Sequence, residues 1–528
     1  MSAVEALAPE AAPPAAPPAN ADLAAWLAVA AGTLGAFMAM LDISVVNSAL
    51  PVLQGEIGAT QSEGTWVSTA YLVAEIVVIP LTGWLERLLG LKLFLILASL
   101  MFVGFSMLCG VSPDLNTMII GRVGQGLAGG ALVPTALTII ARRLPAHQQA
   151  QGMALFASAV ILGPIVGPLL GGWLTENLSW RYAFFMNLPI CAALMVLLVV
   201  GLQADKGDWR ELREADWAGI FGMALGLGGL TVMLEEGHRE QWFSSELIRT
   251  LAAITVLGVG LITWGQLRAR RPVVRLALLK NASLAAVIGL MLVAGALMFS
   301  SMFAVPQFLA TIAQYNAIQS GQIISLAGVT AIVGAGIYPV AVAKVDIRVL
   351  VGGAFLVQGT AALLSTHLTA QSDGAVFGIT MMLLGGGMTM AALPLQQVAL
   401  SSVPEEDAGD ASSLYVVSRN LGASIGLAAI ASFQDQRQDL HMWQMHASLA
   451  ANDPAVQQAM IDKTKFFGGG PEGLAAAYQA MDNQVMLDAL VMSFNDVFLA
   501  LGVVTLVVAP LAWFLRPIDP ARAGGAAH

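Results

Sequence analysis

Long apolar runs alternate with short polar or charged turns along almost the whole chain. Each run is bounded by proline, glycine or charge and is long enough, at about 1.5 Å per residue, to cross a bilayer as a helix. The pattern predicts fourteen membrane helices and therefore two termini on one side of the membrane. The expected ranges are 23–49, 64–86, 91–111, 115–142, 148–174, 182–203, 217–235, 247–267, 281–311, 318–343, 347–368, 374–400, 408–432 and 491–515.

Composition supports this interpretation, since 57% of the 528 residues are hydrophobic and only 11% are charged. These values exclude an ordinary soluble globule and indicate an all-α polytopic membrane protein. Residues 1–22 are rich in Ala and Pro and contain no Lys or Arg, which predicts a disordered tail and no signal peptide. Cys109 and Cys191 both fall in apolar runs, which favours buried core residues over a disulfide or a thiolate metal site.

The distribution of basic residues predicts the orientation. Sixteen of the 24 Lys and Arg residues fall in loops and tails on the side of the N-terminus, and six fall in the opposite loops. The other two, Arg122 and Arg419, lie within predicted helices. Because cytoplasmic loops carry the excess of positive charge, we expect both termini to be cytoplasmic.

Three charged residues interrupt apolar runs in the first third of the chain: Asp42, Glu75 and Arg122. A charge inside the membrane is costly and marks a candidate functional site. A carboxyl group in a low-dielectric site takes up a proton more readily than one in water, which is what proton coupling requires. Arg122 can pair with either acid. The alternatives are a structural Asp42 bonded to nearby backbone, a Glu75 in a polar network and a permanent ion pair at Arg122.

The run 148–174 carries a regular pattern of small residues, with glycines spaced four apart and a proline after each of the first two. Such spacing places the glycines on one helix face and lets a second helix approach closely, while neighbouring groups satisfy the carbonyls that proline frees. Tight packing alone also explains the pattern. The residues are Gly163, Pro164, Gly167, Pro168, Gly171 and Gly172.

Several of these segments resemble motifs of one family. LDISVVNSALP around Asp42 is similar to the first-helix signature of drug:proton antiporters, with Ser44 where Thr is usual. GRVGQG, which contains Arg122, and GPIVGPLLGG resemble the fourth-helix and fifth-helix motifs of such antiporters in the major facilitator superfamily. The two helices beyond the usual twelve resemble the fourteen-helix EmrB/QacA branch.

This resemblance implies a major facilitator fold with helices in a 6 + 2 + 6 order. The expected divisions are a cytoplasmic tail (1–22), an N-terminal bundle (23–203), a central helix pair with linkers (204–280), a C-terminal bundle (281–516) and a second cytoplasmic tail (517–528).

The turn GWLERLLGLK resembles the signature loop of the superfamily, in which Gly83 and Gly90 match and Arg87 replaces the usual acid. The corresponding turn AVAKVDIRVL keeps an acid and a base, Asp346 and Arg348. The resemblance implies a role in conformational change. Simple anchoring at the cytoplasmic surface is the alternative.

Soft aromatic and Met side chains, with a few hydrogen-bonding groups, recur on the expected pore helices. Such side chains suit a promiscuous apolar pocket. In the second half, Arg419 either balances an acid or meets an anionic substrate. The candidate substrate-binding residues are Phe37, Met40, Asn47, Gln125, Phe299, Phe303, Gln307, Gln396, Arg419 and Asn420.

The polar segment 434–489 is net negative and is expected outside the cytoplasm as a helical hairpin or docking loop. His441 and His446 are five residues apart, a poor spacing for metal ligands on one helix, so no metal site is predicted.

Taken with the resemblance, these features predict a proton-driven exporter of lipophilic or amphipathic drugs in the inner membrane. The resemblance also implies, for a Gram-negative cell, a periplasmic adaptor and a TolC-like outer-membrane channel as partners. A dedicated exporter of one metabolite, such as a fatty acid or siderophore, is the alternative. The sequence carries no nucleotide-binding loop and no nucleophile–base set, so an enzyme, a cofactor and a nucleic-acid partner are not expected.

Overall fold

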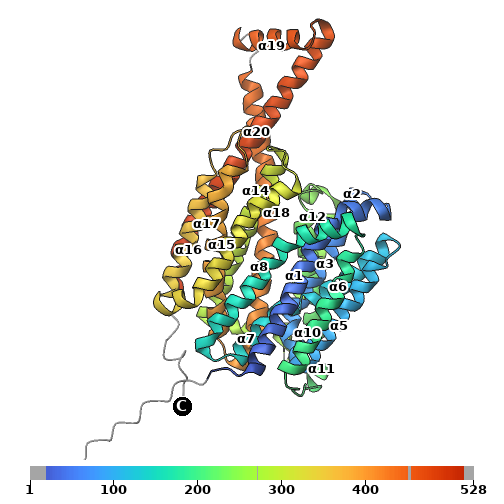
Figure 1. The fold of residues 1–528 in the computed structure, drawn as a ribbon, viewed down its shortest axis with the longest axis vertical. Coiled ribbons are helices and arrows are strands. Elements are labelled where there is room, and N and C mark those ends of the chain that lie inside the picture. The colour runs from blue at the N-terminus through green and yellow to red at the C-terminus, as the bar shows by residue number, and fades with distance from the viewer. Residues whose placement is uncertain (1–19, 270–271, 450–453, 516–528) are drawn as a thin grey trace, which may run out of the picture.

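The structure, a computed structural model, describes residues 20–269, 272–449 and 454–515 (Figure 1). All regular elements in these ranges are helices, which confirms the all-α prediction. The first helix begins at Leu23, as predicted, because the Asp22 carboxylate accepts a hydrogen bond of 2.8 Å from the amide of Ala25. The predicted tails lie outside the described residues, apart from residues 20–22.

Thirteen helices in the described ranges are long and apolar enough to cross a membrane. The fourteenth predicted crossing, at 64–86, is helical but interrupted. It comprises α3 (Trp66–Val78), a 3-10 turn η1 (Ile79–Leu81) and α4 (Thr82–Leu89). Pro80 lies in the 3-10 turn, where its missing N–H breaks the regular hydrogen bonding of an α-helix.

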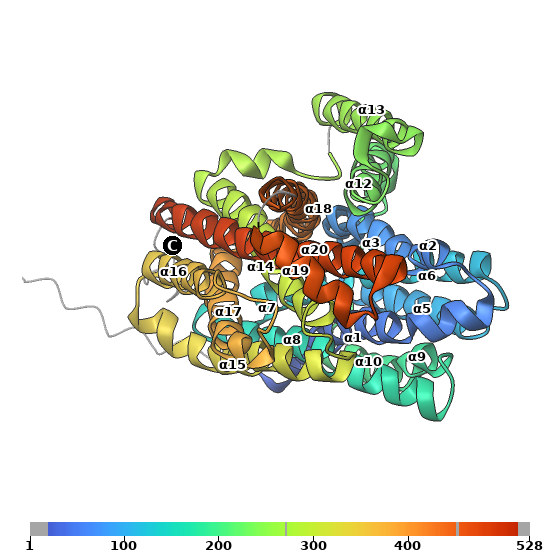
Figure 2. The same cartoon turned by 90° about the horizontal axis from the view of Figure 1, so that it is seen from above.

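The N-terminal bundle is built on α1 (Leu23–Ile57), against which α7, α8 and α10 pack. Its helices appear in blue to green in Figure 1 and lie side by side in Figure 2. Besides α1, α3 and α4, the bundle contains α2 (Gln61–Gly64), α5 (Leu91–Gly110), α6 (Leu115–Gly129), α7 (Leu132–Arg143), α8 (Ala146–Asn177), α9 (Tyr182–Phe185) and α10 (Asn187–Gly201).

Two further helices, α12 and α13, pack on each other at the edge of the molecule, and α12 contacts both α3 and α18 (Figure 2). The central elements are α11 (Arg210–Arg213), α12 (Trp217–Glu236), η2 (Trp242–Ser244), α13 (Glu246–Arg268) and η3 (Leu276–Lys280). The C-terminal bundle contains α14 (Ala282–Thr311), α15 (Ala317–Lys344), α16 (Ile347–Leu364), η4 (Gly374–Val376), α17 (Phe377–Ser401), η5 (Glu405–Asp407), α18 (Ala408–Ser448), α20 (Gly470–Val508) and η6 (Ala509–Phe514).

The polar segment 434–489 is a helical hairpin that projects beyond the bundles (Figure 1). The predicted helix 408–432 continues to Ser448, and the predicted helix 491–515 begins at Gly470. Both helices therefore extend beyond their apolar parts into polar sequence. Between them lies α19 (Pro454–Phe466). We call the face where α1 begins and α20 ends the terminal side, and the face with the hairpin the hairpin side.

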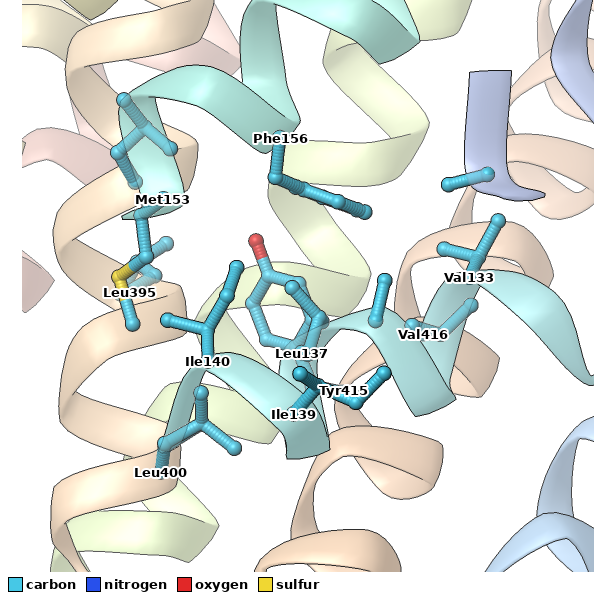
Figure 3. Close-up of a cluster of buried hydrophobic side chains, with 14 of the residues drawn as sticks. Val133, Leu137, Ile139, Ile140, Met153, Phe156, Leu395, Leu400, Tyr415 and Val416 are labelled. Atoms are coloured by element: carbon cyan, nitrogen blue, oxygen red, sulfur yellow. The ribbon is translucent and has the colours of Figure 1, made fainter. Parts of the chain in front are cut away.

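The two bundles share a hydrophobic core on the terminal side but have separate cores on the hairpin side. Figure 3 shows the shared part, where side chains of α7 and α8 pack against side chains of α17 and α18. The residues labelled there are Val133, Leu137, Ile139, Ile140, Met153, Phe156, Leu395, Leu400, Tyr415 and Val416. The described state is therefore sealed on the terminal side.

Candidate functional site

A buried charge network centres on Asp42, near the middle of α1. One carboxylate oxygen, Oδ2, lies 2.6 Å from Nη1 of Arg122 on α6. The other, Oδ1, accepts hydrogen bonds from Gln125 Nε2 at 3.0 Å and from Asn187 Nδ2 at 2.6 Å. These four side chains are at most 1% exposed. Sequence analysis left open which acid pairs with Arg122, and in the structure the partner is Asp42.

Arg122 is held by more than its counter-ion. Its Nε donates to the carbonyl of Val67 at 3.0 Å, and Nη1 donates to Gln125 Oε1 at 3.1 Å. Its guanidinium carbon lies 4.3 Å from the centre of the Tyr71 ring. An ion pair removed from water is tolerated when further hydrogen bonds and an aromatic face satisfy the remaining donors. Arg122 is thereby fixed on α6, whereas protonation of Asp42 would remove its partner charge.

Asn187 is a member of this network that sequence analysis missed. It begins α10, and its Nδ2 also lies 2.9 Å from Ser106 Oγ, which in turn donates to the Phe184 carbonyl at 2.8 Å. The signal that could have identified it is an amide side chain inside the apolar run 182–203. Asn187 links α1, α5 and α10 at the level of Asp42.

The glycine pattern of α8 lies against α1. A Cβ at Gly163 would lie 2.9 Å from the Cβ of Met40, and a Cβ at Gly167 or Gly171 would lie closer still to Ser44 or Ser48, respectively. Ser44 Oγ donates to the carbonyl that Pro168 leaves free, that of Pro164, at 3.4 Å. A Cβ at Gly172 would meet no neighbouring atom within 4 Å. The small residues therefore set the close approach of α8 to the helix that carries Asp42.

Glu75, on α3, is 4% exposed, and positive charges of both bundles act on its carboxylate. The charges acting on it are Arg419 of α18 and Arg122 of α6. Arg419 Nε donates to Asn420 Oδ1 at 3.2 Å. Sequence analysis left Arg419 without a partner, and the structure places Glu75 within its electrostatic reach.

A second charge network joins the bundles on the terminal side. Arg87 Nη1 lies 2.6 Å from Asp410 Oδ2, so the base that replaces the family's usual acid meets an acid on α18. Arg275, in the linker after α13, pairs with Asp407 and lies 3.7 Å from Asp410. The absence of a Cβ at Gly83 permits this contact, since one there would lie 2.6 Å from Asp410 Oδ1.

Further contacts extend the terminal-side network. Arg142 on α7 pairs with Glu86 and donates to the carbonyl of Glu405 at 3.2 Å. The hydroxyl groups of Thr138 and Ser412 lie 3.1 Å apart across the same interface. The polar contacts described between the two bundles all lie on this side, at the edge of the shared hydrophobic core. Opening the terminal side therefore requires the contacts that cross between the bundles to break: Arg87 with Asp410, Thr138 with Ser412, and Arg142 with the Glu405 carbonyl.

The second copy of the turn motif is built differently. The Asp346 carboxylate accepts from the backbone N–H of Arg348 at 2.8 Å and so caps α16, while Arg348 Nε donates to the Leu515 carbonyl at 2.6 Å. Gly90, in the first copy, has a φ of +80°, a conformation that favours glycine, where α4 turns into α5. A role of these turns in conformational change stays a prediction.

The predicted substrate-binding residues are distributed over five helices, α1, α6, α14, α17 and α18. Gln125 belongs to the Asp42 network, and Asn47 accepts from Ser68 Oγ at 2.6 Å. Phe299 and Phe303 on α14 are 39% and 47% exposed. Within the described ranges, Gln307 Oε1 and the buried Gln396 Nε2 have no hydrogen-bond partner. Phe37 and Met40 are half-buried on α1, beside Asp42. Substrate contact by any of these residues stays a prediction.

The two hairpin histidines contact different acids. His441 Nε2 lies 2.6 Å from Asp496, which also accepts from Arg437 Nε at 2.6 Å. His446 lies 3.3 Å from Asp482. Each histidine thus contacts a different acid along the hairpin.

Comparison with known proteins places the chain among transporters. A family model described as Major Facilitator Superfamily matches residues 32–427. The multidrug export protein EmrB of Escherichia coli (strain K12) is 31% identical, over 94% of this chain and 96% of that protein. The colistin resistance protein EmrB of Acinetobacter baumannii is 28% identical, over 93% and 96%. The fatty acid resistance protein FarB of Neisseria gonorrhoeae is 28% identical, over 96% and 98%.

Solved structures agree on the fold. The human organic anion transporter MFSD10 (TETRAN) superposes with a TM-score of 0.57 at 16% identity, covering 91% of this chain and 99% of that one. The proton:xylose symporter XylE gives a TM-score of 0.57 at 16% identity, covering 93% and 96%. The family match, the relatives and the many apolar helices together define a multi-pass membrane transporter and not an enzyme. The chain belongs to the Major Facilitator Superfamily.

Proposed function

We propose that this protein exports lipophilic and amphipathic drugs across the inner membrane in exchange for protons. The observation that carries the proposal is the buried Asp42–Arg122 pair, an ionisable group with a fixed counter-charge inside a transporter fold. The names of the relatives from Escherichia coli and Acinetobacter baumannii support drug export. The count of basic residues by loop supports cytoplasmic termini, so the terminal side is the cytoplasmic face.

In the proposed cycle, Asp42 carries the proton. In the described state its carboxylate is matched by Arg122 and two amides. Protonation removes its charge and leaves Arg122 bonded to Val67, Gln125 and the Tyr71 ring. Because α8 packs tightly on α1, a change in the Asp42 contacts is transmitted to α8. Proton binding thereby shifts the balance between the state sealed on the terminal side and its alternative.

Glu75 supports this cycle from the bundle interface. Its carboxylate interacts electrostatically with Arg122 of the N-terminal bundle and with Arg419 of the C-terminal bundle. The charge of Glu75 therefore affects both bundles. A substrate cation entering between the bundles would compete with these arginines for the carboxylate. Glu75 is therefore the second candidate for coupling substrate and proton.

Transport in proteoliposomes tests the proposal. We expect a permanently charged lipophilic cation and a neutral drug both to accumulate in liposomes with an acidic lumen, because antiport moves the drug into the acidic compartment. Accumulation should stop when an ionophore collapses the pH gradient. Protein-free liposomes provide the background. Drug movement that persists without the gradient would contradict proton coupling.

The alternative, export of one metabolite, is favoured by the likeness to FarB, whose name concerns fatty acid resistance. The same liposomes distinguish the two functions. Movement of a fatty acid with neither drug transported would replace multidrug export by this narrower function.

We further propose that the hairpin 434–489 contacts a periplasmic adaptor, which would in turn meet a TolC-like outer-membrane channel. The hairpin projects beyond the bundles and exposes large side chains at its far end, with Phe466 83% and Trp443 69% exposed. Exposed aromatic side chains on a projecting element are typical of interaction sites. A lid over the hairpin-side opening is the alternative role.

Shortening the hairpin tests this contact. Removal of residues 442–485, with a short Gly-Ser closure, leaves Arg437, His441 and Asp496 in place at its base. We expect co-purification of a co-expressed periplasmic adaptor to be lost, while transport in proteoliposomes is kept. Trp513→Ala, which changes an exposed aromatic residue at the terminal side, serves as the control. Unchanged co-purification would remove the hairpin from the adaptor interface.

A further inference from the structure

An apolar groove runs down the outer face of the C-terminal bundle, between α15 and α16. Both helices pack along α17 and scarcely touch each other, so α17 forms the floor of the groove. Its volume is about 530 Å³. Its walls and floor consist of aliphatic, Met and Gly residues with a single hydroxyl, that of Thr330, which already donates to the carbonyls of Leu326 and Ala327.

Glycines hold this groove open. Gly353 on α16 and Gly386 on α17 line it, and a Cβ at either would meet no neighbouring atom within 4 Å. The aliphatic side chains beside them are poorly covered by protein, with Val333, Ile337 and Val349 each more than half exposed. The groove therefore has space for a flexible apolar chain and no hydrogen-bonding group for a polar one.

The length of the groove along α16 is close to the hydrocarbon thickness of one bilayer leaflet. On α16 its lining extends from Val349, in the first turn, to Val357. The eight steps between these two residues rise by about 12 Å, close to the roughly 15 Å of hydrocarbon in one leaflet. The end nearest the terminal side is the two-residue turn that joins α15 to α16. An acyl chain entering from the terminal-side surface would fill the groove along its length.

Two basic residues flank this end of the groove. Lys344 is the last residue of α15 and is exposed, and Arg348 lies in the first turn of α16. The only acid between them, Asp346, is engaged in capping α16. Arg348 donates to the Leu515 carbonyl through Nε, and no hydrogen bond is described for its two terminal amino groups. The turn thus offers two cationic groups at the level of lipid headgroups.

We propose that this groove binds an anionic phospholipid of the terminal-side leaflet, with an acyl chain between α15 and α16 and the phosphate on Lys344 and Arg348. Lipid tails are as apolar as the groove, so headgroup attraction and packing, and not the hydrophobic effect, select the bound lipid. Basic sites between membrane helices are known to hold such headgroups. This inference does not depend on the proposed transport function.

Native mass spectrometry of the full-length protein, with dioleoyl phosphatidylglycerol and dioleoyl phosphatidylcholine as probes, tests the proposal. We expect wild type to retain one phosphatidylglycerol with a preference over phosphatidylcholine on the order of fivefold per basic residue. Lys344→Gln should remove part of that preference. Gly353→Leu and Gly386→Leu should weaken retention of both lipids, because leucine adds side-chain atoms to the groove at positions where a Cβ meets no protein atom within 4 Å.

Matched controls separate this site from general effects. Gly104→Leu places the same side chain in open space on α5, and Lys280→Gln removes a terminal-side lysine outside the groove. Both should behave as wild type. Lipid retention unaffected by the groove-filling variants would overturn the proposal. Conversion of a dimer to a monomer by Gly353→Leu, without a change in bound lipid, would instead assign the groove to a second copy of this chain.

Discussion

Replacing Asp42 with Asn is expected to abolish gradient-driven drug movement in proteoliposomes, down to the level of protein-free liposomes. The amide keeps the size of the side chain but cannot exchange a proton. Drug binding, measured by fluorescence of the purified protein, should remain because Asp42 is fully buried and asparagine keeps the size of its side chain. Gradient-driven movement by this variant would refute Asp42 as the coupling acid and shift attention to Glu75, for which Glu75→Gln is the parallel variant.

The same substitution leaves Arg122 charged and unmatched, so stability must be measured beside transport. Removal of one partner of a buried ion pair costs about 3–5 kcal/mol, whereas removal of both is often close to neutral. We expect Asp42→Asn and Arg122→Gln each to lower thermal stability and the double variant to recover most of it. Transport should be absent in all three. A stable double variant without transport separates the coupling role from a purely structural one.

Neutralising Arg87 is expected to open the terminal side. Arg87→Gln leaves Asp410 with only the more distant Arg275, so the sealed state loses its closest ion pair between the bundles. The readout is thiol labelling of a Ser412→Cys variant, since Ser412 is 1% exposed behind this seal. A loss of about 1.4 kcal/mol from the sealed state would raise the labelling rate roughly tenfold.

Arg143→Gln is the matched control, because Arg143 ends α7 beside Arg142 and no ion pair is described for it. Asp410→Asn should reproduce the effect of Arg87→Gln. The parent protein without Ser412→Cys gives the labelling background from Cys109 and Cys191, both buried. Equal labelling rates in the Arg87, Asp410 and control variants would show that the ion pair does not hold the terminal side closed.

The membrane helices could be predicted from the sequence because a bilayer imposes a length and an apolar character on each crossing. That rule does not determine where a helix is interrupted inside the membrane or how far it continues outside. The crossing at 64–86 contains a 3-10 turn at Pro80, and α18 continues as a helix to Ser448, well beyond its apolar part. Hydropathy marks the apolar segment of a helix and carries no information on where backbone hydrogen bonding ends.

The candidate site could be predicted only in part. Asp42, Glu75 and Arg122 were marked by their charge in apolar runs, but Asn187 carries no charge and was not identified. The partner of Arg87 is 323 residues away in the sequence, so no local pattern connects it with Asp410. Single-sequence reasoning identifies which polar groups are costly to bury. The three-dimensional packing decides which of them compensate one another.

α18 is one continuous helix of 41 residues, about 60 Å long. Its first turn carries Asp410 in the terminal-side seal, and its far end forms one arm of the projecting hairpin. Mechanically it is a lever arm that runs from one side of the membrane to beyond the other. If α18 tilts as a rigid rod by about 5° around its terminal-side end, the hairpin end moves by about 5 Å. A partner bound to the hairpin would then be displaced in each transport cycle.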